Sequence, residues 1–79
     1  MNYREVREII DNCRPILAGR DPAMIGAALA DLTAMLFAGH HPSIREAMIE
    51  AWVETMRKLV EPNEKMILEA YGGEWPTQQ

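Results

Sequence analysis

The segment from Pro22 to Ala38 constrains the fold most, because nearly all of its side chains are apolar. Asp31 and Thr33 are its polar side chains, and Ala, Leu, Met and Ile fill most other positions. A helix that is apolar all round is normally buried all round. The segment is short for a membrane span, and a charge at its middle would be costly in lipid. We therefore expect a helix buried inside protein, and no membrane association.

The rest of the chain also predicts helices, since no run alternates apolar and polar residues or gathers β-branched ones. Apolar residues recur at helical spacing before Pro15 and again over residues 43–60. Pro15 is expected to end or kink the first helix near Cys13. Pro62 either starts a short fourth helix or kinks one long helix. The sequence thus predicts an all-α protein, a compact three- to four-helix bundle with an apolar central helix.

The expected domain limits follow from the length of the chain and the glycines near its end. A chain of 79 residues forms one domain. Gly72 and Gly73 are expected to close the last helix. We therefore predict a single helical domain over residues 1–73 and a flexible tail over 74–79.

The helix boundaries also give His40 and His41 an expected place. Asp21 is suited to cap the helix that begins at Pro22. Gly39 is expected to end that helix in the left-handed conformation, and Ser43 with Glu46 forms a capping box for the next one. The two histidines then fall in the connection between helices. We interpret them as turn residues rather than as a site.

Charge and cysteine content bear on partners and location. The net charge of -4 and the lack of a basic stripe argue against a nucleic-acid binder. The single cysteine, Cys13, cannot form an intramolecular disulfide and fits a reducing, cytoplasmic setting.

Asp31 is the main chemical anomaly, because a carboxylate in an apolar helix needs water, a cation or a proton. We interpret it as a buried polar residue paired with an arginine: Arg14, Arg20 or Arg45. The alternative is a small-ligand or metal-binding protein that uses Asp31 and the His40/His41 turn. Cys13 could join such a set, but the spacing matches no zinc motif. We expect no metal site and no cofactor.

Two surfaces favour self-association. Ile49, Val53 and Val60 form a second apolar patch beside the main stripe of their helix. Gly26, Ala30 and Ala34 form a row of small residues that would let two helices approach closely. Large exposed apolar patches mark interfaces. We therefore expect a non-enzymatic protein–protein interaction module without catalytic residues. The expected partner is a second copy in a homodimer, or alternatively another protein.

Overall fold

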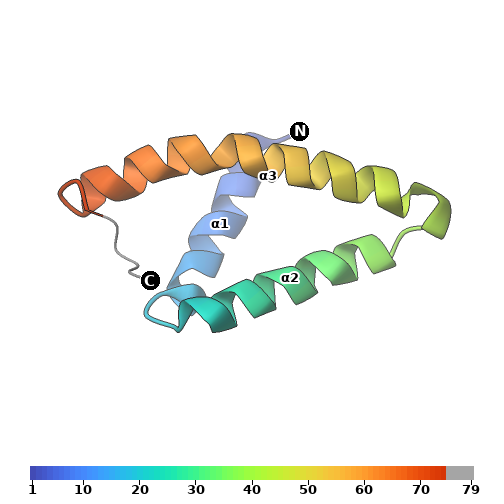
Figure 1. The fold of residues 1–79 in the computed structure, drawn as a ribbon, viewed down its shortest axis with the longest axis horizontal. Helices are drawn as coiled ribbons and strands as arrows, with labels where there is room; N and C mark the ends of the chain where they lie inside the picture. Colours follow the sequence, from blue (N-terminus) through green and yellow to red (C-terminus); the bar gives the residue numbers. More distant parts are fainter. Residues whose placement is uncertain (75–79) are drawn as a thin grey trace. The chain divides into compact units, whose positions relative to one another are not determined.

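The computed structural model describes residues 1–74, and each regular element in that part of the chain is an α-helix. Helix α1 covers Tyr3–Leu17, α2 covers Pro22–Ala38 and α3 covers Pro42–Ala70 (Figure 1). The all-helical prediction is therefore confirmed. Of the predicted tail, 74–79, all but Glu74 lies outside the described residues.

The chain divides into two units, Met1–Asp31 and Leu32–Gln79, so α2 begins in the first unit and ends in the second. The first unit contains α1 and most of α2. The second contains the last residues of α2 and the whole of α3. Within residues 1–74, no helix combines the length and apolar character that a membrane span requires.

Helix α1 starts at a cap that the sequence analysis did not anticipate. The Asn2 side-chain oxygen accepts hydrogen bonds from the backbone N–H groups of Arg4 (3.0 Å) and Glu5 (3.3 Å). The helix continues past Cys13 to Leu17 with Pro15 inside it. Because Pro15 lies in the last turn, its missing N–H removes one bond near the end of the helix. Of the two expectations for this helix, an end near Cys13 is wrong.

Helix α2 begins as predicted, with the Asp21 carboxylate accepting from the Ala23 N–H at 2.8 Å. Its side chains are not enclosed, however, and no residue of α2 is buried. Leu32 is 62% exposed and Met35 61% exposed. The same holds for the rest of the described chain, which contains no buried side chain. The contacts within each unit therefore leave the apolar surface of α2 open to solvent.

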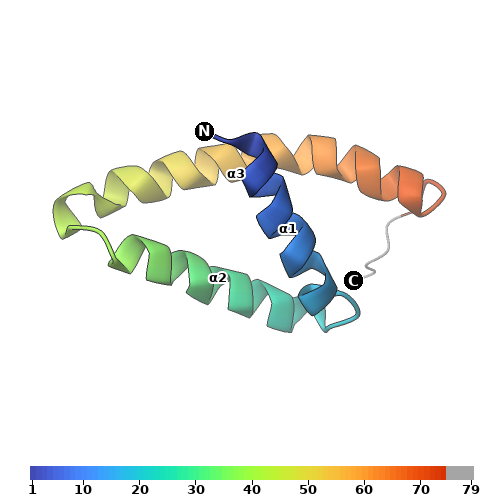
Figure 2. The same cartoon turned by 180° about the vertical axis from the view of Figure 1, so that it is seen from behind.

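The described residues form three helices and not four, because α3 runs through Pro62 without a break. Figure 2 shows α3 as one gently bowed helix. The end of α3 follows the prediction, since Gly72 and Gly73 adopt positive φ angles of 67° and 88°. The Gly73 N–H reaches back to the Leu68 carbonyl at 2.6 Å.

In the second unit, α3 follows Leu32–Ala38 through a short turn at Gly39, His40 and His41. One ring contact joins the two helices of this hairpin: Phe37 meets Trp52 edge to face, with ring centroids 6.4 Å apart. The segment Leu32–Ala38 is about 10 Å long, whereas α3 continues about 27 Å beyond Trp52. Most of α3 therefore extends past its neighbour in this unit.

Candidate interaction surface

The histidines lie in the predicted connection, and each is bonded to a helix end. His40 Nδ1 is 2.9 Å from the carbonyl oxygen of Leu36 in the last turn of α2. His41 is the N-cap of α3, and its Nδ1 accepts from the Ser43 N–H at 3.1 Å. The Ser43 hydroxyl is 2.8 Å from the same nitrogen. The expected Ser43 cap is therefore wrong, because His41 occupies that role and Pro42 is the first helical residue.

Arg45 closes the end of α2 from the first turns of α3. Its Nε donates to the carbonyls of Phe37 (3.2 Å) and His40 (2.9 Å), and its Nη2 donates to Ala38 (2.9 Å). The Phe37 and Ala38 carbonyls are among those that a helix end leaves without intrahelical donors, and the His40 carbonyl lies in the turn that follows. Gly39, expected to end α2 in the left-handed conformation, does not have a positive φ. The backbone N–H groups of Gly39 and His40 still donate to the Met35 and Phe37 carbonyls, and Arg45 adds side-chain donors.

Asp31, expected to be buried, is the last residue of the first unit and is exposed in the structure, so its burial stays a prediction. No apolar enclosure surrounds it, because the described part of the chain contains no buried side chain. Of the arginines considered as its partners, Arg45 binds the carbonyls at the end of α2, and the Arg20 guanidinium donates to the Ile16 carbonyl. The structure therefore shows no low-dielectric setting for an Asp31 ion pair.

The residues considered as metal ligands do not gather in the described chain. Residues 1–74 contain no group of three His, Cys, Asp or Glu side chains placed to hold a metal ion. Cys13 is a free, exposed thiol on α1, whereas His40 and His41 use their Nδ1 atoms on the helix ends around the turn.

The row of small residues on α2 is open. Gly26, Ala30 and Ala34 are exposed, and a methyl group placed on Gly26 would meet no atom within 4 Å. A row of small residues without a neighbour does not by itself define an interface, so its role stays a prediction.

The predicted patch on α3 falls into two neighbouring grooves. Ile49 and Val53 line a groove of about 500 Å³ with the charged residues Glu50, Glu54, Arg57 and Lys58. Val60 belongs to a larger groove of about 660 Å³. Ile49 is 36% exposed, Val53 is half-buried and Val60 is 56% exposed. The three residues share one helix, but the structure does not join them in one hollow.

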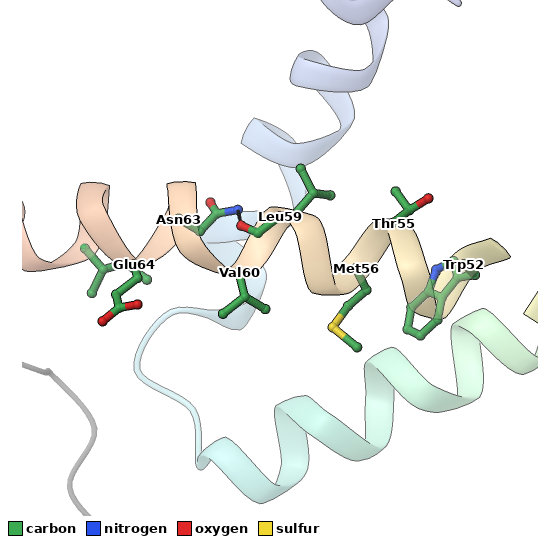
Figure 3. A pocket seen from close by; sticks show the side chains of 8 residues that line it. Trp52, Thr55, Met56, Leu59, Val60, Asn63 and Glu64 are labelled. Atoms are coloured by element: carbon green, nitrogen blue, oxygen red, sulfur yellow. Dashed lines mark hydrogen bonds between the residues drawn. The ribbon is translucent and has the colours of Figure 1, made fainter. Parts of the chain in front are cut away.

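We call the larger hollow the α3 groove. It is lined from α3 itself, by Trp52, Thr55, Met56, Leu59, Val60, Asn63, Glu64 and Ile67. Figure 3 shows two rows of these side chains along the helix: Trp52, Met56 and Val60 point to one side, and Thr55, Leu59 and Asn63 to the other. Successive members of a row are four residues apart, as expected on a helix surface. Val60 was predicted from the sequence as an interface residue, whereas the surface around it was not predicted.

The two uncharged polar side chains of the α3 groove, Thr55 and Asn63, bond to the helix that carries them. Thr55 Oγ1 donates to the Ala51 carbonyl at 2.9 Å, and Asn63 Nδ2 donates to the Leu59 carbonyl at 2.8 Å. A polar group that already has a partner costs less to remove from water. The groove is therefore better suited to an apolar contact than its composition suggests.

Comparisons of the chain with family models, curated proteins and solved structures found no match. Functional inference therefore rests on the chemistry of this surface.

Proposed function

We propose that this chain is a small, non-enzymatic helical interaction module that self-associates through α3, most simply as a homodimer. The observation that carries the proposal is the α3 groove, an apolar surface whose large side chains are exposed. Leu59 is 53% exposed and Val60 56% exposed. Contiguous apolar patches on soluble proteins mark interaction sites. A two-fold interface is the commonest way in which a protein covers such a patch with its own copy.

We further propose that association completes a compact bundle in which α2 becomes the apolar central helix. Exposed Leu32 and Met35 support this step, because burying apolar surface stabilises by roughly 25 cal/mol per Å². A small domain has little other means of offsetting the entropy of ordering its chain.

The chemistry of the groove supports binding rather than catalysis. An active site needs several convergent polar groups, whereas Thr55 and Asn63 donate to their own helix. The net charge of -4 supports a protein partner over nucleic acid, and the lone thiol of Cys13 supports a cytoplasmic location.

Val60→Glu tests the proposal. We expect the wild-type chain to approach twice its 9.0 kDa mass at high concentration in size exclusion coupled to light scattering. The dissociation constant of the variant dimer should be at least about 100-fold higher, because each copy would bury an unpaired carboxylate at a cost of roughly 3 kcal/mol or more. Circular dichroism should still show helix if the variant folds.

Ala47→Glu is the matched control, because it adds the same charge on the opposite side of α3, where it should leave the association unchanged. A wild-type mass of one chain at every concentration up to the millimolar range would contradict the proposal. Equal weakening by both substitutions would show that charge, and not the α3 groove, controls association.

A further inference from the structure

A row of five apolar residues and Asn63, which overlaps the α3 groove, has the spacing of a coiled-coil seam. It advances by alternating steps of four and three residues, through Ile49, Val53, Met56, Val60, Asn63 and Ile67. Alternating steps of this kind keep one stripe of side chains facing a neighbouring helix. None of these residues is buried, so the row is accessible along its length. We call it the heptad seam.

The two borders of the heptad seam differ in chemistry. Glu50, Arg57 and Glu64, which follow Ile49, Met56 and Asn63, lie on the same border at intervals of two turns. Of the two glutamates, Glu64 belongs to the α3 groove and Glu50 to the smaller groove beside it. The other border is apolar and carries Trp52, Leu59 and Met66. Charges beside such a seam set the orientation of the partner helix. The charged border therefore discriminates between the ways in which two helices could pair.

We propose that a second copy of this chain docks on the heptad seam with its α3 antiparallel, so that Arg57 pairs with the partner's Glu64. This assignment rests on the proposed self-association and specifies its geometry. In an antiparallel pair, the charged border of one helix faces the charged border of the other. Because the pair is two-fold symmetric, the ion pair between Arg57 and the partner's Glu64 occurs twice. In the same register, Met56 lies opposite the partner's Ile67 and Val60 opposite the partner's Asn63.

A parallel pair would lose this complementarity. There, the charged border of one helix faces the apolar border of the other, so Leu59 would meet the partner's Glu64 and Trp52 the partner's Arg57. The carboxylate would then be partly desolvated without a cation. The charge pattern therefore favours the antiparallel orientation.

The polar side of α3 also favours a protein over a lipid surface as the occupant. Six glutamates outnumber three cations there: Glu46, Glu50, Glu54, Glu61, Glu64 and Glu69 against Arg57, Lys58 and Lys65. Helices that lie on anionic membranes carry an excess of Lys and Arg on the polar side. The charge of α3 has the opposite sign.

Cysteine cross-linking tests the orientation. Two single variants, Met56→Cys and Ile67→Cys, are made with Cys13→Ser, because Cys13 is exposed and would react. Light scattering and circular dichroism on the reduced proteins first establish that each variant dimerises and is helical. The two are then mixed and mildly oxidised. We expect a disulfide between the two variants, because position 56 lies opposite the partner's position 67.

Each variant oxidised alone should give little disulfide, since its two thiols would lie about 16 Å apart along the helix axis. Self-linking of both variants would overturn the antiparallel orientation and favour a parallel pair. Dimers that give no cross-link would overturn the Arg57–Glu64 register of the heptad seam while leaving self-association intact. A wild-type chain that stays monomeric would overturn the proposed function as well.

Charge reversal gives a second readout in the unlinked protein. Arg57→Glu should weaken the dimer about tenfold, and adding Glu64→Arg should restore most of the loss. Lys65→Glu, the matched control on the polar side, should leave the dissociation constant unchanged. An unrestored double variant, or an equal effect of the control, would contradict the Arg57–Glu64 pairing.

Discussion

The polar residues at the α2–α3 turn act on the backbone. Arg45, His40 and His41 together engage carbonyls at the end of α2 and an N–H at the start of α3. These groups belong to helix ends, where the intrahelical ladder leaves backbone donors and acceptors without partners. The side chains of this turn therefore join the end of α2 to the start of α3.

Arg45→Ala should lower the free energy of unfolding by about 1–2 kcal/mol, because it removes three donations to carbonyls at a helix end. Urea denaturation at one fixed protein concentration measures the change. Arg45→Lys should recover part of it, since an ammonium keeps the charge but not the forked geometry. Lys65→Ala, a truncation on the polar side of α3, should change stability by less than about 0.5 kcal/mol. A similarly small loss in Arg45→Ala would show that the cap contributes little.

The range of a cap along the chain explains only part of what could be predicted, since the Asn2 cap is as local as the Asp21 cap and was not predicted. The Asp21 cap was predicted correctly because its acceptor and donor are two residues apart. The role of Arg45 as a cap was not predicted, because Arg45 contacts carbonyls five to eight residues away. These contacts cross a turn whose geometry no local pattern specifies. His41 was not predicted as the N-cap of α3, because serine is a more common capping residue than histidine and Ser43 lies at the same boundary.

At the scale of elements, Pro62 shows what the sequence could predict and what it could not. The apolar periodicity correctly predicted helix on both sides of Pro62. It left open a break or a kink there, and the structure shows one helix, Pro42–Ala70. A proline removes one backbone bond and clashes with the preceding turn, which a bend can relieve. Whether a helix bends or breaks depends on tertiary contacts as well as on the local sequence.

Pro62→Ala should raise the free energy of unfolding by about 1–3 kcal/mol, because alanine restores an N–H for the Lys58 carbonyl and relieves the clash. Urea denaturation at one fixed protein concentration measures this change in the free energy of unfolding. Pro62→Gly also restores the N–H, but should lie about 1 kcal/mol below the alanine variant because glycine is a poor helix former. Destabilisation by alanine would instead show that the bow of α3 is required for packing.

At the scale of the whole molecule, the sequence predicted an excess of apolar helix surface more reliably than it predicted what covers it. The prediction that Pro22–Ala38 forms a helix is correct, whereas its enclosure is not confirmed, since no residue of the helix is buried. Helical periodicity follows from local spacing. Enclosure and the pairing of Asp31 depend on which surfaces meet, and one chain's sequence pattern does not specify that.

If the fold depends on a second copy, the melting temperature must depend on protein concentration. Mass action favours the associated, folded state as concentration rises. With an unfolding enthalpy near 0.7 kcal/mol per residue, two chains give roughly 110 kcal/mol, and the melting temperature should rise by about 4–5 °C per tenfold increase in concentration. Circular dichroism melts from 1 µM to 1 mM would measure this, with reversibility checked by rescanning. Val60→Glu should melt at a lower temperature and depend less on concentration if its remaining helix unfolds within one chain. A wild-type melting temperature independent of concentration would mean that the chain unfolds as a monomer, and α3 would then have to be covered by the chain's own helices.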